Sequence, residues 1–320
     1  MWQLIIKRLL KFPIQILIIT FLLYFISVIL PILVHEVNDS ISLRWFFTNS
    51  FEAPYGIFYR YFSWIRNILF YGDFGRSLIN GEQVIDVISP RVIITTRLLS
   101  LSFILLFFIG IPVGILSTFK KSKLFEKFVN FIVISSTSLP IFTIGFLLIL
   151  LFAFNLRWLP FTGTFQIGVD VEALNFWQIQ LIHLTHTFLP ALTLALSMLF
   201  IPIKLLNTNI NQTKKEIFIN LVRAKGASQF SILKRHILKK DVIMTTIAIL
   251  PMIVTTGLTG TIVVERLFSY RGLGELIFNS FLFNDLLVVK SIIILFATVI
   301  LFVTLICDIL LLILDPRVRI

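Results

Sequence analysis

Apolar runs long enough to cross a lipid bilayer recur along the whole chain, and not only at its start. A helix needs about 20 residues to cross roughly 30 Å of hydrocarbon. We place such runs near residues 12–33, 97–119, 128–154, 187–206, 242–264 and 288–314. Because they recur, a cleaved signal peptide does not account for them. The sequence therefore predicts an all-α, polytopic membrane protein with about six transmembrane helices.

Composition and charge support this interpretation. Apolar residues make up 58% of the chain and charged residues 14%, whereas about 25% of a typical soluble domain is charged. Of the 28 lysines and arginines, 18 lie in four segments on one side of the predicted membrane, residues 7–11, 120–127, 204–240 and 317–319. This bias predicts that both termini are cytoplasmic. It explains the net charge of +12 without nucleic acid, because these segments would contact anionic lipid or a protein partner.

The sequence divides into a first helix with a long external loop, residues 1–96, and a core of five closely spaced helices, residues 97–320. The external segment, roughly 34–96, has an aromatic content that favours folding back on the membrane interface over disorder. Its aromatic residues include Trp45, Tyr55, Tyr59, Tyr61 and Trp64. The run Gly72-Asp73-Phe74-Gly75-Arg76-Ser77 predicts a turn, because its glycines allow positive φ and its Asp and Ser can bond the local backbone.

The longest cytoplasmic loop, residues 207–241, is far longer than a simple connection needs. Thr213 and Glu216 have the spacing of a capping box, so a short helix should begin there. Gly226 can end this helix in the left-handed conformation, and Ser228 can cap a second helix. The loop is therefore either an amphipathic hairpin on the lipid surface or a docking element for a cytoplasmic motor.

Two polar features interrupt the apolar spans. Four consecutive hydroxyl residues stand shortly before Pro140: Ser135, Ser136, Thr137 and Ser138. They could line a passage or bond a neighbouring helix, as Ser and Thr commonly do in lipid. Asp308 lies in the last span, where a charge is costly, so we expect it to pair with a neighbouring helix or, alternatively, to contact solute.

The chain offers little for covalent or metal chemistry. His183 and His186 would share a helical face, but two histidines do not complete a metal site. Cys307 is the single cysteine and lies inside the last span. The chain has no G-x-x-x-x-G-K-[ST] sequence to bind ATP phosphates. We therefore expect no catalytic residues, no metal ligands and no cofactor bound by this chain.

The cytoplasmic loop resembles the "EAA" loop of ABC importer permeases, in the form found in oligopeptide, dipeptide and nickel permeases. The resemblance rests on Leu221-Val222-Arg223-Ala224-Lys225-Gly226-Ala227-Ser228 and on Leu233-Lys234-Arg235-His236. Other segments are similar to the family in the same order along the chain: Asp73-Phe74-Gly75-Arg76-Ser77, Ile111-Pro112-Val113-Gly114, Ser138-Leu139-Pro140, Arg157-Trp158-Leu159-Pro160, Leu189-Pro190-Ala191-Leu192-Thr193, Val264-Glu265-Arg266-Leu267-Phe268, Gly272-Leu273-Gly274 and Leu314-Asp315-Pro316-Arg317.

This resemblance implies a type I ABC importer permease fold in a multi-pass protein of the cell membrane. It also implies that a coupling loop contacts a separate ATPase through Leu221, Val222, Arg223, Ala224, Lys225, Gly226, Ala227 and Ser228. The implied partners are a second homologous permease in a heterodimer, two ABC ATPase subunits that bind ATP and Mg, and an extracytoplasmic solute-binding protein. The chain itself would be a transport subunit and not an enzyme.

The resemblance implies peptides as the transported solute, with nickel or a metal chelate, haem and glutathione as alternatives. In such systems the binding protein largely selects the solute. A standalone secondary transporter or channel is a remote alternative, which would more often bury several ionisable groups. A membrane-embedded enzyme would instead show clusters of acidic, histidine or metal-ligand residues at helix ends.

Overall fold

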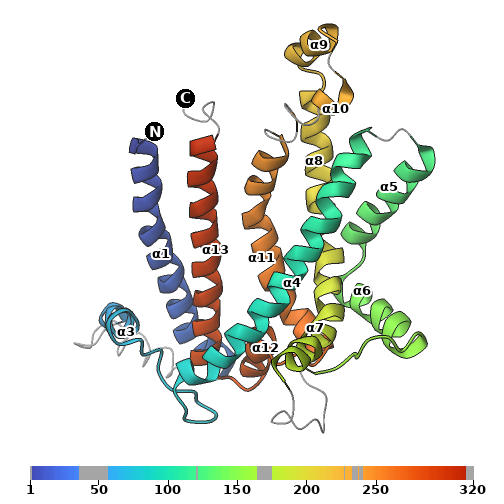
Figure 1. Cartoon of the computed structure of the whole chain (residues 1–320). Coiled ribbons are helices and arrows are strands. Elements are labelled where there is room, and N and C mark those ends of the chain that lie inside the picture. Colours follow the sequence, from blue (N-terminus) through green and yellow to red (C-terminus); the bar gives the residue numbers. More distant parts are fainter. Residues whose placement is uncertain are drawn as a thin grey trace. The chain divides into compact units, whose positions relative to one another are not determined.

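The computed structural model describes residues 2–35, 57–119, 122–163, 175–226, 228–232, 237 and 241–314. Regular structure in these residues is helical, apart from an isolated bridge between Arg76 and Gln83 (Figure 1). The predicted all-α class is therefore confirmed. In chain order the helices are α1 (Trp2–His35), α3 (Ile57–Tyr71), α4 (Val84–Phe119), α5 (Lys123–Ser138), α6 (Ile141–Leu148), the π-helix η2 (Ile149–Asn155), α7 (Phe176–Met198), α8 (Phe200–Thr213), α9 (Ile217–Ala224), α10 (Gln229–Ile232), α11 (Ile243–Leu267), α12 (Leu273–Leu282) and α13 (Leu286–Leu314).

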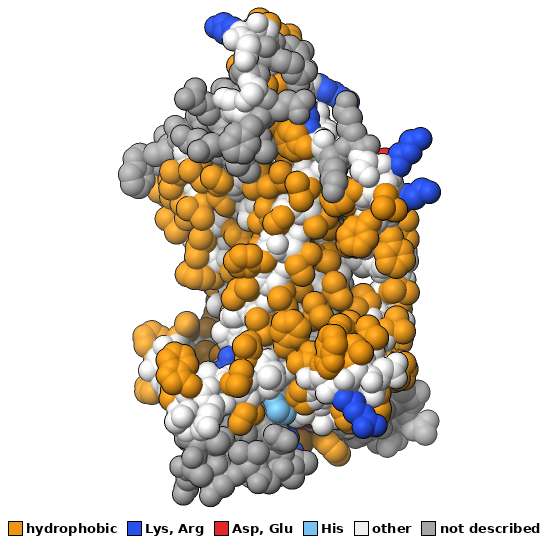
Figure 2. Space-filling view, turned by 45° about the vertical axis from the view of Figure 1, so that its right-hand side comes forward, with side chains coloured by type: hydrophobic (Ala, Val, Ile, Leu, Met, Phe, Trp, Pro, Cys, Tyr) orange, Lys and Arg blue, Asp and Glu red, His pale blue; other side chains and the backbone are white. Residues whose placement is uncertain are grey.

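Five helical segments in the described part of the chain are long and apolar enough to cross a membrane. They are Ile5–Ile26, Val84–Phe119, Phe176–Thr213, Ile243–Leu267 and Leu286–Leu314. A sixth results if the bent pair Lys123–Ser138 and Ile141–Asn155 counts as one span. Apolar side chains cover most of the described surface in Figure 2, as expected of helices that face lipid tails. The prediction of about six spans is confirmed.

The predicted third span, residues 128–154, consists of two helical pieces joined at a sharp bend. The pair Lys123–Ser138 and Ile141–Asn155 is bent by 117°. Pro140 has no N–H, and its ring disfavours the helical conformation in the residue before it. Leu139 accordingly takes an extended conformation, with φ −86° and ψ 129°.

Several helices extend beyond the predicted spans. α4 begins at Val84 instead of residue 97. The helical segment of α7 and α8 covers Phe176–Thr213 instead of residues 187–206. At 1.5 Å per residue, α4 is about 54 Å long, whereas the hydrocarbon is roughly 30 Å thick. Hydropathy detects only the part of each helix that suits lipid, so it misses the more polar ends.

The chain divides into two compact units. The larger unit comprises Ile93–Glu275 and Val303–Ile320 with Met1, and the smaller unit comprises Trp2–Val92 and Leu276–Phe302. The loop that carries α9 and the central hydrophobic core both belong to the larger unit.

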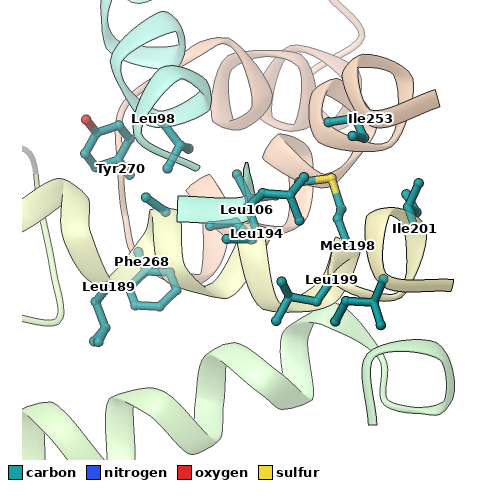
Figure 3. Close-up of a cluster of buried hydrophobic side chains, with 14 of the residues drawn as sticks. Leu98, Leu106, Leu189, Leu194, Met198, Leu199, Ile201, Ile253, Phe268 and Tyr270 are labelled. Carbon is teal, nitrogen blue, oxygen red and sulfur yellow. The ribbon is translucent and has the colours of Figure 1, made fainter. Parts of the chain in front are cut away.

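Helix α7 lies at the centre of the larger unit. It packs against α5, α6 and α11, and its Leu189, Leu194 and Met198 side chains are fully buried (Figure 3). A small residue allows α11 to come close, because a Cβ on Gly260 would lie 2.8 Å from Leu194 Cδ2. Such close packing stabilises helix pairs in lipid, where the hydrophobic effect does not drive them together.

Helix α4 approaches α8 through two glycines one turn apart. A Cβ on Gly110 would lie 2.5 Å from Pro202 Cγ. A Cβ on Gly114 would lie 3.2 Å from both Ile203 Cα and Leu206 Cβ. The Gly-x-x-x-Gly spacing puts both glycines on the same face of α4. This contact joins α4 to the helix that leads into the loop carrying α9.

In the smaller unit, aromatic side chains of α3 pack on α1. The Tyr61 hydroxyl lies 2.8 Å from Thr20 Oγ1 and donates to Leu17 O at 2.9 Å. Lys290 of α13 is buried, and its ammonium lies 4.4 Å from the Trp64 ring centroid. This cation–π contact offsets part of the cost of burying a lysine. Two further aromatic residues of the external segment lie outside the described residues: Trp45 and Tyr55.

The turn predicted for residues 72–77 is confirmed. Gly72 and Gly75 have φ values of +63° and +94°, a region in which other residues are strained. Gly75 N donates to Asp73 Oδ1 at 2.8 Å. Ser77 Oγ accepts from Ile79 N at 3.3 Å and donates to the carboxylate of Asp285 at 2.5 Å. The turn is thereby held to the residue that precedes α13.

The α4–α8 contact predicts that Gly114→Leu destabilises the protein. The new side chain would have to displace the α8 backbone, and overpacking of this kind costs about 1–3 kcal/mol. Thermal unfolding of the purified protein in mild detergent measures the loss. Phe108→Leu is the control, because it places leucine on a position of α4 that is 78% exposed. Equal melting temperatures for the two variants would contradict the contact.

Candidate functional site

The loop between α8 and α11 forms a short helix, a glycine turn and a second short helix, as predicted. Helix α9 is followed by Gly226, which has φ +85°. Ser228 Oγ then accepts a hydrogen bond from Ser231 N at 3.2 Å and caps α10. Figure 1 shows α9 beyond the end of α8 that is opposite α7.

The predicted capping box at Thr213 is wrong. Helix α8 continues through Thr213, which is buried, so this residue has a helical backbone and cannot cap a following helix. Glu216 N instead donates to Thr213 O at 3.0 Å and closes a turn. Helix α9 begins one residue later, at Ile217, where Glu216 O accepts from Ile219 N at 3.1 Å.

One face of α9 packs on its own chain. Ile219 is fully buried in a cluster with Leu206 and Ile210 of α8. Phe218 and Val222 are partly buried against the same cluster. The helix is therefore held in place from behind by α8.

The other face of α9 is open. Ile217 and Leu221, one helical turn apart, are 79% and 59% exposed. Among the residues of the resemblance, Ala224, Lys225, Gly226 and Ser228 are also exposed. Arg223 lies in α9, and Ala227 lies outside the described residues. An exposed apolar pair flanked by polar groups is a surface suited to docking another protein.

Polar contacts join the end of α8 to the end of α4. Lys214 Nζ donates to Thr118 O at 2.5 Å and lies 3.6 Å from the centroid of the Phe119 ring. About two turns earlier, in α8, Asn207 Nδ2 donates to Ser117 Oγ at 2.7 Å. A cation at the C-terminal end of α4 also suits the helix dipole. The sequence does not reveal this connection, because Lys214 is one of nine basic residues in the segment 204–240.

The hydroxyl cluster before Pro140 contains one residue that bridges helices. Ser136 is buried, and its Oγ donates to Ser197 O at 3.0 Å and accepts from Phe200 N at 3.2 Å. These backbone groups lie where α7 gives way to α8, so Ser136 satisfies polar atoms at a helix break. Ser135 is partly buried, whereas Thr137 and Ser138 are exposed.

A buried carboxylate joins the end of α11 to the start of α12. Glu265 is fully buried. Its Oε1 accepts from Thr95 Oγ1 at 2.6 Å, and its Oε2 accepts from Glu275 N at 3.0 Å. Thr95 Oγ1 in turn accepts from Leu273 N at 2.8 Å. The carboxylate and the hydroxyl thus satisfy N–H groups in the first turn of α12, where negative charge suits the helix dipole.

Gly272 makes room for this carboxylate, and Gly274 lets the start of α12 approach the backbone of α11. A Cβ on Gly272 would collide with the carboxylate of Glu265. A Cβ on Gly274 would lie 2.5 Å from the carbonyl carbon of Thr261. Glu265 and both glycines belong to the motifs that carried the resemblance, and the structure supplies a physical reason for these residue types.

The expected pairing of Asp308 with a neighbouring helix stays a prediction, and two other ionisable residues are buried more deeply. Asp308 is partly exposed on α13, whereas Glu265 is fully buried and Lys290 is 7% exposed. Glu265 and Lys290 both stand near helix ends, where an ionisable side chain can often reach water. Only their tertiary neighbours show that they are enclosed.

The two histidines of α7 do not face a common ligand. His186 is buried, and its Nδ1 lies 2.8 Å from Ile182 O of its own helix. His183 lines a groove between α7 and α4. Among the described residues, no group of three or more His, Cys, Asp or Glu side chains could hold a metal ion.

Comparison with known proteins identifies the family. Residues 110–320, well over half of the chain, match the family described as the binding-protein-dependent transport system inner membrane component. The chain belongs to this family. It is therefore a multi-pass membrane component of a transport system, and the relation to permeases stated from its motifs is confirmed.

Two relatives in the family are named as permeases. The oligopeptide transport system permease protein AppB of Bacillus subtilis is 30% identical over 274 residues, which cover 84% of each chain. The glutathione transport system permease protein GsiC of Escherichia coli is 27% identical over 269 residues, covering 82% of this chain and 80% of GsiC.

A solved structure of the methionine ABC transporter MetNI shares the fold. One chain of MetNI, captured in an inward-facing conformation, superimposes with a TM-score of 0.53 at 15% sequence identity. The similarity covers 72% of this chain and 97% of the MetNI chain. The predicted permease fold is thereby confirmed.

The network around Glu265 predicts that Glu265→Leu destabilises the protein more than Glu265→Gln. Leucine would leave the Thr95 hydroxyl and the Glu275 N–H buried without their acceptor, at a cost of about 1–3 kcal/mol each. Glutamine keeps one of the two oxygen acceptors. Melting temperatures in detergent rank the variants, with Glu82→Leu at an exposed site as the control. A Glu265→Leu protein as stable as wild type would refute the role of this carboxylate.

Proposed function

We propose that this chain is one permease subunit of an ATP-driven importer and forms half of a translocation pathway for peptides. Membership of the binding-protein-dependent transport family and the fold shared with a chain of an ABC transporter support a permease. The remaining partners would be a second homologous permease in a heterodimer, two ABC ATPases that bind ATP and Mg, and an extracytoplasmic binding protein.

The open face of α9 is the observation that carries the coupling proposal. Ile217 and Leu221 would seat in a groove of an ATPase, while Ile219 on the opposite face holds α9 to α8. Because Lys214 bonds the last turn of α4, movement of the ATPase would reach two membrane helices through one short segment. This arrangement favours a docking element over a hairpin lying flat on lipid.

The charge distribution supports a cytoplasmic location for α9 and for both termini. The segment 204–240 carries nine of the 28 basic residues, more than any other connection between the spans. An ATPase that uses cytoplasmic ATP must dock on this side. The α9 loop and the positive-inside bias therefore point to the same face of the membrane.

The relatives favour an amide-containing solute. AppB is named for oligopeptides, GsiC for glutathione, and a permease of Brucella abortus that is 27% identical over 256 residues is named as a putative peptide transport protein. Peptides fit these names better than nickel, a metal chelate or haem. Glutathione is itself a small peptide and is the alternative.

The docking proposal predicts that Leu221→Asp and Gly226→Pro separate the permease from its ATPases. A carboxylate at position 221 would be buried unpaired in the interface, and proline cannot adopt the positive φ of Gly226. Affinity purification of the tagged chain in mild detergent, with mass spectrometry and an ATPase assay, measures the result. We expect at least a tenfold loss of co-purifying ATPase while the second permease is retained.

Gln212→Asp is the matched control, because Gln212 is an exposed residue of α8 and lies outside α9. It should keep wild-type ATPase levels. If Leu221→Asp also keeps them, α9 is not the docking element. If the wild-type chain purifies without ATPases and moves solute without ATP, it is a standalone transporter or channel and the importer proposal fails.

A further inference from the structure

A groove of about 440 Å³ lies between α4 and α7 in the larger unit, and it has both apolar and polar lining residues. Its polar side chains are Thr96, Arg97 and Ser100 from α4, and Gln180, His183 and Thr187 from α7. Most of the surface of these helices is apolar, so six polar side chains around one hollow form a distinct site.

The groove lies toward the end of α4 that is opposite α9. A rise of 1.5 Å per residue places Arg97 about 33 Å from the end of α4 at Phe119, which is close to the thickness of the hydrocarbon. With α9 in the cytoplasm, Arg97 is near the outer boundary of the membrane. A solute delivered from outside would meet this groove early on its path.

The charge of Arg97 is not neutralised within the described chain. Its side chain is exposed, and no carboxylate of the described residues pairs with it. Glu265, a carboxylate of the same unit, is fully buried and already accepts hydrogen bonds from Thr95 and Glu275. Near the boundary of the membrane the long Arg97 side chain can reach water, so its guanidinium is available to an anion that arrives from outside.

Two neutral groups beside Arg97 are also available. The side chains of Ser100 and Gln180 make no hydrogen bonds to the described residues. In contrast, Thr187 Oγ1 is occupied by His183 O at 2.6 Å and by the Tyr270 hydroxyl at 2.8 Å. The groove therefore combines the Arg97 guanidinium and the Ser100 hydroxyl of α4 with the Gln180 amide of the facing helix α7. No carboxylate of the described residues neutralises the guanidinium.

We propose that this groove binds the C-terminal carboxylate of a peptide during import. Arg97 pairs with the carboxylate through its two-pronged guanidinium, and Ser100 and Gln180 bond the last peptide groups. A terminal carboxylate and backbone amides occur in every unmodified peptide, so the site accepts many sequences. This inference rests on the proposed function, which names peptides as the solute.

Uptake of a peptide with a free C-terminus and of its amidated form tests the site. The complete transporter, with both permeases, ATPases and binding protein, is reconstituted in liposomes carrying wild type, Arg97→Gln, Arg97→Lys or Gln180→Leu. The same binding protein serves every variant, so its own preference cancels when acid-to-amide uptake ratios are compared between variants. Arg271→Gln is the control, since Arg271 is an exposed arginine of the same unit outside the groove.

We expect Arg97→Gln to lower uptake of the acid peptide about tenfold and to leave uptake of the amidated peptide near its wild-type value, because a charge-assisted pair is lost. Arg97→Lys should be intermediate, and Arg271→Gln should match wild type. An acid-to-amide ratio unchanged by Arg97→Gln overturns the site. Loss of the second permease from purified Arg97→Gln would also overturn it, because Arg97 would then pair with that subunit.

A second variant tests the groove if Arg97→Gln does not assemble. Ser100→Cys in a Cys307→Ser background places the only thiol of the chain in the groove. A membrane-impermeant maleimide should label it, and the acid peptide should protect it better than the amidated peptide. No labelling, or equal protection, overturns the site. If the assembled wild-type transporter imports neither peptide, the solute in the proposed function is wrong as well.

Discussion

The fold depends on the rule that a polar group inside hydrocarbon must find its partner within the protein. Long helices satisfy their own backbones, but every break exposes N–H and C=O groups. At the α7–α8 break, one hydroxyl from Ser136 serves both an acceptor and a donor of the backbone. Between α11 and α12, Glu265 and Thr95 serve the N–H groups of the next helix. At both breaks, specific side chains therefore satisfy the exposed backbone groups.

Features that depend on local sequence could be predicted, whereas features that depend on tertiary neighbours could not. Hydropathy predicted the spans, because each apolar run is by itself long enough to indicate a membrane-crossing helix. Local stereochemistry predicted the turn at Gly226, since positive φ is a property of one residue. The enclosure of Glu265 depends on which helices come to lie alongside. Such partners are distant in sequence, and no local pattern names them.

Helix α9 shows how one short segment serves two purposes. Ile219 faces inward and is fully buried, whereas Ile217 and Leu221 face outward and are exposed. A helix that was apolar on one side only would be committed either to its own chain or to a partner. By placing apolar residues on both sides, α9 can remain folded in the isolated subunit and still offer a surface to another protein. The candidate coupling loop was visible in the sequence, but this division of faces was not.

The lysine at the end of α8 binds a main-chain atom, and this choice has an evolutionary consequence. The acceptor of Lys214 is the carbonyl oxygen of Thr118, which every amino acid possesses. Substitution at position 118 therefore cannot delete this acceptor, whereas the neighbouring contacts to the Phe119 ring and the Ser117 hydroxyl depend on side chains. This one hydrogen bond is sensitive to substitution of its donor at position 214. A hydrogen bond from a lysine side chain to a main-chain oxygen can persist among relatives that share few of the surrounding side chains.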